Sequence, residues 1–234
     1  MYKIMILTDS DGYPRSFPAS EVFELEETYP YLIREHFKSS TFWQMSYGNI
    51  TTTKLVNQPM GYLTHWKPDI IIVQAGIADC RPQAFSDFQK EIISMLTWRL
   101  FTRIKKYVNH PALIKHRQVY RVSKSSFRTT VRKFKLVFPQ SKIFWLEIST
   151  GPRFEEFCPG VERRKAEFNA IIKEAYGEDF VSVQKKILEV DGFNAKDHGH
   201  MNKKGHQVLA DVLIERINAF LGSSGRKAVL HGQK

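Results

Sequence analysis

Cysteine is scarce in this chain: among its 234 residues only Cys80 and Cys158 are present. Two distant cysteines make no disulfide framework, and no Cys-x-x-Cys spacing of a zinc site occurs, so a reducing compartment fits best. The short apolar N-terminal stretch lacks the basic region and cleavage site of a signal peptide. No apolar run approaches the roughly 20 residues of a membrane span. These absences predict a cytoplasmic protein.

Acidic residues are missing from one long internal segment. Between Glu91 and Glu147 there is no Asp or Glu, whereas the same segment holds 13 of the 35 Lys and Arg residues. The rest of the chain has 22 basic and 24 acidic residues. We therefore expect a near-neutral domain that carries one strongly basic segment, residues 92–146.

This basic segment has several candidate partners. Acidic glycans or glycolipids would suit its charge. An anionic membrane surface would suit residues 98–135, where aromatic side chains lie among Lys and Arg, and would make the protein a peripheral one. Nucleic acid would suit the charge alone, and we rank it last because no nucleic-acid-binding motif is present. The simplest alternative is a solvated helical face.

Five apolar stretches are typical of β-strands, and helical patterns lie between them. The stretches are continuous rather than alternating, which indicates a parallel sheet buried on both faces. The expected strands are 2–8, 42–47, 69–76, 142–149 and 180–184, and the expected helices are 28–38, 85–107, 127–138, 161–177 and 202–222. This alternation predicts one doubly wound α/β domain over residues 1–221.

Two segments depart from a minimal domain of this kind. Residues 85–141 exceed the length that one crossover needs, and we expect a basic helical insertion of two helices joined near "NHPALIKHRQ", residues 109–118. Such an insertion could form a lid or a docking surface. Residues 222–234, "GSSGRKAVLHGQK", are expected to form a flexible basic tail.

Polar residues follow the strand ends, where ligands bind in open α/β sheets. A nucleophilic serine needs a base to take its proton and a third group to orient that base. Ser10 follows the first strand, and Asp197 and His200, three residues apart, precede the last helix. These three are a candidate triad, although Ser10 could instead cap a turn that Asp9 and Asp11 brace. The Gly-x-Ser-x-Gly elbow of the α/β-hydrolases is absent.

The histidines near residue 200 allow a metal alternative. Asp197, His198, His200 and His206 are all suitable zinc ligands. No His-Glu-x-x-His spacing is present, however, and His206 is better explained as packing within the final helix. We therefore expect neither a metal nor a cofactor.

Several short blocks together resemble the SGNH, or GDSL-like, hydrolases. Each block is weak alone, but their order and their placement after strands match that family over residues 2–221. The matching blocks are Thr8-Asp9-Ser10, Gly48 in "SYGNITT", Gly76-Ile77-Ala78-Asp79, Asp197-His198-Gly199-His200 and Gly205-His206.

The resemblance implies a three-layer α/β/α sandwich with a five-stranded parallel sheet, a flavodoxin-like arrangement. It also implies acyl-ester hydrolysis or transfer, with Ser10 as nucleophile, His200 as base and Asp197 as its orienting group. The backbone N–H groups of Ser10 and Gly48 would bind the oxyanion. The family's third donor is an Asn side chain, and here Ala78 occupies that position. Loss of one such donor typically lowers the rate by about 10²–10³.

Three arginines could compensate for that missing donor. Arg15, Arg81 and Arg153 each lie beside a proline just past a strand, so each is expected at the catalytic edge. An arginine there could stabilise the oxyanion or bind an acidic group of the substrate. Asp79 could also touch substrate, but we favour a role in holding its own turn together.

The sequence as a whole predicts a serine esterase or acyltransferase that forms an acyl-enzyme. We expect its substrate to be an acylated, in particular O-acetylated, carbohydrate or glycolipid, such as an intermediate of surface-polysaccharide synthesis. A different class stays open because of Ala78. In that alternative the protein is a catalytically weak member of the fold that binds an acidic glycan or an anionic membrane surface.

Overall fold

Five parallel strands form the sheet at the centre of the protein. The computed structural model describes residues 1–16, 21–95 and 110–231. The strands are β1 (Lys3–Thr8), β2 (Thr41–Ser46), β3 (Ile70–Gln74), β4 (Lys142–Leu146) and β5 (Phe180–Val181). Their order in the sheet is β2-β1-β3-β4-β5, and each neighbouring pair is parallel. The predicted strands and the parallel sheet are confirmed.

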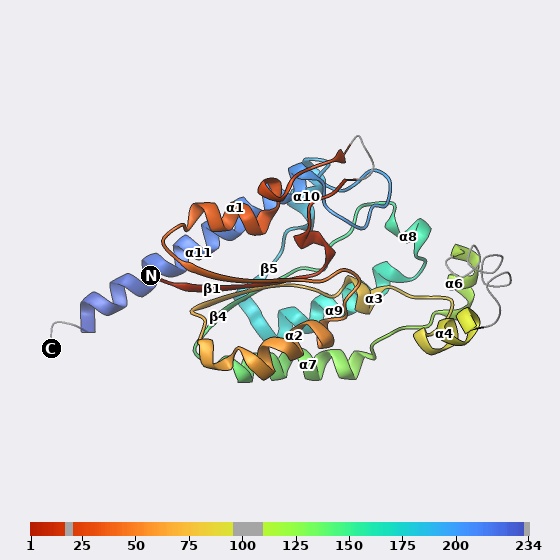
Figure 1. Ribbon diagram of the computed structural model, residues 1–234, viewed down its shortest axis with the longest axis horizontal. Coiled ribbons are helices and arrows are strands. Elements are labelled where there is room, and N and C mark those ends of the chain that lie inside the picture. The colour runs from red at the N-terminus through yellow and green to blue at the C-terminus, as the bar shows by residue number, and fades with distance from the viewer. Residues whose placement is uncertain (17–20, 96–109, 232–234) are drawn as a thin grey trace.

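Helices cover both faces of this sheet, as Figure 1 shows with the sheet seen edge-on. On one face α1 (Tyr29–His36), α10 (Gln184–Glu189) and α11 (Lys203–His231) pack against Ile4, Ile6 and Ile72. On the other face α2 (Thr52–Tyr62), α7 (Lys124–Val137) and α9 (Val161–Tyr176) pack against Met5, Leu7 and Val73. Alternate residues of one strand thus enter two separate apolar layers. The predicted three-layer α/β/α sandwich is confirmed.

The sequence analysis missed helix α2. Its sequence discourages a helix, because Thr52 and Thr53 are β-branched and Pro59 lies inside. Tertiary contacts override these preferences: Leu55 and Val56 are fully buried against the sheet. The short α10 was missed as well, and its Ile187 is buried in the opposite layer.

The expected two-helix insertion at 85–141 was wrong in its details. The segment contains α4 (Asp87–Met95), α6 (Pro111–Arg117) and α7, so the supposed link at 109–118 itself forms a helix. Helix α7 is not an appendage, because Phe127, Val131 and Phe134 are fully buried in the core. Of the helices described in this segment, α4 and α6 project beyond the sheet in Figure 1, whereas α7 lies against it. The second half of the expected helix 85–107 lies outside the described residues.

The last helix continues past its expected end. Helix α11 extends to His231, whereas the sequence predicted that the helix would stop near Gly222. Two further short helices, α3 (Ile77–Cys80) and α8 (Phe154–Phe157), follow β3 and β4 and lie beside the site described below. Within the described ranges, no helix is both long and apolar enough to cross a membrane.

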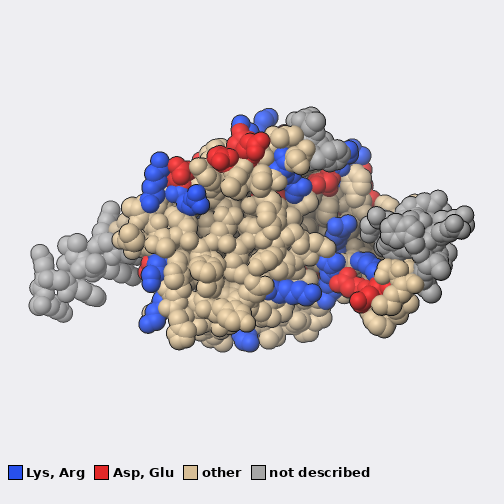
Figure 2. Space-filling view, in the orientation of Figure 1, with Lys and Arg blue, Asp and Glu red and all other residues tan. Residues whose placement is uncertain are grey.

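Many cations of the basic segment have acidic partners. On the face seen in Figure 2, Lys and Arg lie interspersed with Asp and Glu. The pairs within 4.0 Å include Arg121–Asp87, Lys124–Glu167, Arg128–Glu174, Arg132–Glu174 and Lys142–Asp179. Because carboxylates of other segments neutralise these side chains, the described part of the segment fits a solvated helical face better than a membrane-binding surface.

Candidate active site

Ser10 lies in a tight turn at the carboxyl end of β1. The chain leaves β1 and forms one turn of 3-10 helix, Ser10–Gly12. The side chain of Asp9 caps this turn by accepting from the N–H of Asp11 at 3.1 Å. Gly12 has no room for a side chain, because a Cβ there would clash with Thr8 and Ser46. The run of polar residues after β1 therefore serves to expose Ser10 at the sheet edge.

The structure brings Ser10, His200 and Asp197 together. Ser10 Oγ lies 2.8 Å from His200 Nε2, and His200 Nδ1 lies 2.7 Å from Asp197 Oδ2. A carboxylate only accepts hydrogen bonds, so Nδ1 carries the proton and Nε2 is free to accept the proton of Ser10. The other carboxylate oxygen of Asp197 accepts from the N–H groups of Gly199 and His200 at 2.9 and 3.2 Å.

The charges around His200 favour its role as a base. Burial alone lowers the pKa of His200, but the hydrogen bond to Asp197 and the negative charges of Asp11 and Asp197 outweigh burial and raise it. Burial raises the pKa of Asp197, but its bond to His200 and the nearby Arg15 outweigh burial and lower it. Asp197 therefore stays ionised and stabilises a positive charge on His200.

Asp11 joins the serine turn to the histidine loop. One oxygen of its carboxylate accepts from the N–H of Met201 at 3.1 Å. The other accepts from Gln74 Nε2 at 2.9 Å, and Gln74 Oε1 in turn accepts from the hydroxyl of Thr8 at 2.8 Å. These bonds fix the two loops relative to each other, although they belong to opposite ends of the chain. The sequence analysis did not identify Gln74 as part of the site, although a polar residue at the end of an otherwise apolar strand could have indicated it.

Asp9 is a second, nearly buried carboxyl beside Ser10. It is 4% exposed, its N–H donates to the carbonyl of Gln74, and it lines the cavity in front of Ser10. Burial, followed by the charge of Asp11, raises the pKa of Asp9 to about 7. Asp9 therefore braces the turn, as the sequence analysis expected. Its raised pKa means that the free energy of unfolding falls as the pH rises.

A cavity of about 430 Å³ opens in front of the serine and histidine. Its walls are largely apolar, and the side chains that form them are Ile50, Ile77, Ala78, Phe154 and Phe157. Its polar rim includes Asn49, Arg81 and Lys196. An acyl group fits such walls, because burying its carbon atoms removes apolar surface from water. The phenylalanines of α8 were not expected from the sequence, and Asn49, which follows the second strand at the ligand-binding edge, had been given no role.

The three arginines occupy different places. Arg81 lines the cavity. Arg15 reaches Asp197, with Nη1 at 3.8 Å from Oδ2. Arg153 instead pairs with Glu156 at 2.8 Å on the surface of α8, and neither side chain is among those that line the cavity. Of the expected substrate-binding arginines, Arg81 is thus the one placed to touch a bound molecule. The orientation of the Gly48 N–H toward an oxyanion stays a prediction.

Asp79 is buried and faces away from substrate. Its carboxylate accepts from the N–H and the hydroxyl of Thr52, at 2.8 and 3.0 Å, and thereby caps the start of α2. Burial raises the pKa of Asp79 to about 7. These contacts favour a structural role, although the partner is the start of α2 and not, as expected, the turn that contains Asp79. The expectation that Asp79 could bind substrate was wrong, because the side chain is fully inaccessible.

The raised pKa of Asp79 predicts a stability effect. Between pH 4 and 7 the folded chain keeps a proton that the unfolded chain has released, so the free energy of unfolding should fall as pH rises through this range. Asp79→Asn keeps an acceptor for Thr52 and removes the charge. Between pH 5 and 8, the free energy of unfolding measured in urea should decrease less in this variant than in wild type, by about 1–4 kcal/mol. The exposed Asp211→Asn is the control, and equal decreases in all three proteins would contradict the prediction.

His206 does not join the catalytic histidine. It is fully buried, stacks on Tyr29 at 6.0 Å between ring centroids, and accepts from the N–H of Tyr29 through Nδ1. Burial lowers the pKa of His206 to about 4, so it is neutral. In the described part of the chain, no group of three or more His, Cys, Asp or Glu is arranged to hold a metal ion. The packing role expected for His206 fits this environment.

Known proteins resemble this chain in structure rather than in sequence. No protein-family model and no curated protein matches the sequence. Solved structures do match: a lipase/acylhydrolase from Enterococcus faecalis has a TM-score of 0.63 at 13% identity over 94% of this chain and 96% of that one. An acetylxylan esterase from Geobacillus stearothermophilus has a TM-score of 0.59 at 18% identity, covering 92% and 94%. An esterase from Pseudoalteromonas sp. has 0.55 at 15%, covering 95% and 100%. The chain therefore has the fold of the SGNH, or GDSL-like, hydrolases.

Proposed function

We propose that this protein is a serine esterase that forms an acyl-enzyme on Ser10. The observation that carries the proposal is the pair of short contacts, Ser10 to His200 at 2.8 Å and His200 to Asp197 at 2.7 Å, at the mouth of a largely apolar cavity. A serine used only to cap a turn needs neither the histidine nor its carboxylate partner.

The reaction proceeds in two halves. Ser10 Oγ attacks the acyl carbon of the ester while His200 Nε2 takes the proton of the hydroxyl. The resulting oxyanion accepts from the N–H groups of Ser10 and Gly48. When the intermediate collapses, the alcohol leaves with the proton from His200, and the acyl group stays on Ser10. Water, or a second alcohol, then attacks this acyl-enzyme with His200 again as base, and Ser10 regains its proton.

The substrate proposed is an acyl ester of a carbohydrate or glycolipid. Two observations support this class: the acetylxylan esterase of similar fold acts on an acylated polysaccharide, and the cavity combines apolar walls with a polar rim. Arg81 on that rim suits an acidic group of the alcohol part. A transferase would use the same residues, so an assay with and without acceptor sugars separates hydrolysis from transfer.

The experiment that tests this proposal is labelling with a fluorophosphonate probe, read by intact mass. We expect one adduct on the wild-type chain and none on Ser10→Ala. Ser39→Ala, which alters an exposed serine between α1 and β2 that does not line the catalytic cavity, should still be labelled. Turnover of acetyl and longer acyl esters then defines the acyl preference.

A second function has one observation in its favour. Ala78 lines the cavity where the resembled family has an oxyanion donor, which suits a catalytically weak binding protein. A folded wild-type chain that neither reacts with the probe nor hydrolyses any ester, but binds an acidic glycan, would favour this alternative over the esterase.

The proposed mechanism predicts a pH profile. His200 must be neutral to accept a proton, and its pKa lies above the ordinary value of 6.5. The kcat/KM for an ester without ionisable groups should therefore rise with pH and reach half of its plateau above pH 6.5. Initial rates between pH 5 and 9 measure this directly. A rate that is flat or falls over pH 6 to 8 would contradict His200 as the base.

A further inference from the structure

Three side chains on the rim of the catalytic cavity could donate a hydrogen bond to an oxyanion, apart from the triad itself. They are Asn49, Arg81 and Lys196. All three are exposed, but Arg81 and Lys196 have long side chains, whereas Asn49 has a short one and follows Gly48 directly. A donor that stabilises a transition state must be held in place before the reaction, because ordering it during the reaction would raise the barrier. The contacts around Asn49 meet this requirement.

Asn49 reaches the cavity from the strand next to the nucleophile. Strands β1 and β2 are paired up to Thr8 and Ser46, and the N–H of Tyr47 still donates to the carbonyl of Thr8. Ser10 and Asn49 therefore lie in adjacent loops at one sheet edge. Ala78 follows β3, on the other side of β1. A donor lost on one side of Ser10 can thus be supplied from the other side.

The orientation of the Asn49 amide is set by Arg121. Arg121 Nη1 donates to Asn49 Oδ1 at 2.8 Å and to the Asn49 carbonyl at 3.2 Å. A guanidinium has only N–H donors, so the atom of the amide that faces it must be the oxygen. The NH₂ group then points to the opposite side.

The opposite side is the catalytic cavity. Asn49 lines that cavity and also a neighbouring one of about 630 Å³, and Arg121 lines only the neighbouring one. The amide oxygen therefore lies on the side of the second cavity, and the NH₂ group lies on the side of the catalytic cavity, which Ser10 also lines. Asn49 also has a backbone φ of 55°, in the left-handed region that Asn tolerates better than most residues.

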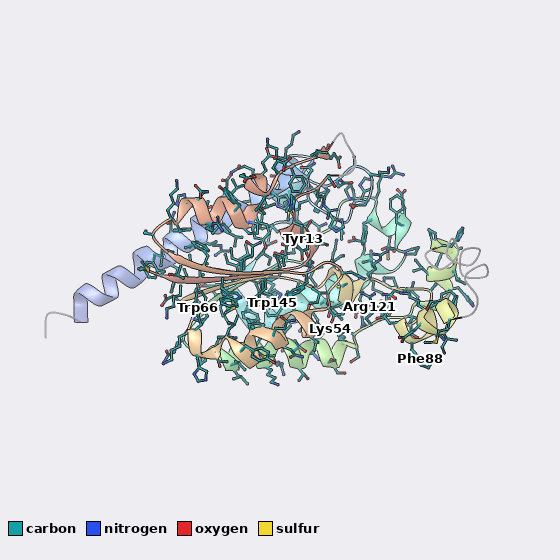
Figure 3. The ribbon with its side chains drawn as sticks, in the orientation of Figure 1. Tyr13, Lys54, Trp66, Phe88, Arg121 and Trp145 are labelled. Atoms are coloured by element: carbon teal, nitrogen blue, oxygen red, sulfur yellow. The ribbon has the colours of Figure 1, made fainter. Side chains whose placement is uncertain are left out.

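Arg121 is itself held in place. Its Nε lies 3.2 Å from Asp87 Oδ2, and its side chain is 17% exposed. In Figure 3 Arg121 lies between the carboxyl end of the sheet and α4, the helix that begins with Asp87. Helix α4 is thus connected through Asp87 and Arg121 to Asn49, which lines the catalytic cavity.

We propose that the side-chain NH₂ of Asn49 is an oxyanion donor of this enzyme, and that Arg121, anchored by Asp87, is its positioning residue. This inference rests on the proposed esterase function. It assigns a role to the part of the insertion nearest the site, and it supplies an oxyanion donor in a chain that has alanine at position 78. The neutral amide adds a donor without a charge that would compete with His200 for Asp197.

The first test compares Asn49→Gly with wild type in ester hydrolysis. Glycine tolerates the same backbone conformation, so the variant removes the donor with little strain. We expect kcat to fall by about 10²–10³ while KM changes little, because the donor binds the transition state more strongly than the substrate. Asn49→Asp, which replaces the NH₂ by an acceptor, should fall at least as far. Arg81→Ala is the matched comparison and should change kcat less than either variant.

The second test is a double-mutant cycle with Arg121→Ala. If Arg121 acts through Asn49, the Arg121→Ala substitution should lower kcat in the wild-type background and have no further effect on kcat in Asn49→Gly. If Arg121 has a purely structural role, its substitution should lower kcat equally in both backgrounds. Melting temperatures of all four proteins identify that case.

The outcomes separate this inference from the function on which it rests. Unchanged kcat in Asn49→Gly, or a change in KM alone, overturns the assignment while wild-type turnover and probe labelling of Ser10 leave the esterase intact. A larger loss in Arg81→Ala than in Asn49→Gly overturns it too, in favour of the arginine. Failure of the wild-type chain to react with probe or ester instead overturns the proposed function.

Discussion

Replacing Ser10 by alanine should lower kcat by a factor on the order of 10⁴–10⁶, with little loss of stability. The variant removes the only atom that forms a bond to the acyl carbon, so His200 and Asp197 have nothing to activate. Residual turnover would come from water in the cavity and from the oxyanion donors, which retain about 10³–10⁴ over the uncatalysed rate in a serine hydrolase without its nucleophile. Ser10 is half-buried in a turn whose cap is Asp9, so the fold does not depend on its hydroxyl.

Initial rates with a chromogenic acyl ester measure this loss, and thermal unfolding checks that the variant is folded. Ser39→Ala, between α1 and β2, gives the background expected of a serine-to-alanine change outside the catalytic cavity. A Ser10→Ala variant that keeps more than about a tenth of the wild-type kcat would exclude Ser10 as the nucleophile.

Asp197→Asn should lower kcat by about 10⁴ while the protein stays folded. That magnitude is known for the equivalent change in another serine hydrolase, where the wrong histidine tautomer results. Here the carboxylate accepts from His200 Nδ1 at 2.7 Å. The NH₂ group of an asparagine could instead donate to Nδ1, and the histidine would then carry its proton on Nε2. The histidine could then no longer accept from Ser10.

The same variant should also move the pH profile. Asp197 raises the pKa of His200 through both its hydrogen bond and its charge. Without that charge, the remaining activity should reach half of its plateau at a lower pH than in wild type. Asp191→Asn, an exposed aspartate of the same loop region, is the control and should leave rate and profile unchanged. An Asp197→Asn variant with wild-type kcat would show that His200 needs no orienting carboxylate.

The fold and the grouping of Ser10, His200 and Asp197 could be predicted because their signals are local. The continuous run of β3 identifies a strand buried on both faces, whatever surrounds it. Ser10 follows a strand directly, and Asp197 and His200 lie in one loop, so their relation depends on a few neighbouring residues. Parallel strands end at a common edge, and this brings Ser10 to the histidine loop across 190 residues of sequence.

The remaining features depend on contacts that local sequence does not encode. Helix α2 forms against its own propensity because Leu55 and Val56 have a sheet to cover. Arg15 and Arg153 look equivalent in the sequence, yet one meets Asp197 and the other Glu156.

By itself, the sequence determined a parallel α/β sheet with a serine, a histidine and an aspartate at its carboxyl edge, since strand burial and short loop spacings are properties of neighbouring residues. Only the tertiary structure decided which groups surround that serine. Asn49 and Arg121 are 72 residues apart, and their contact exists because the loop before α7 lies beside the loop that follows β2. The free energy of packing, summed over distant segments, selects such pairs, and no single stretch of sequence contains it.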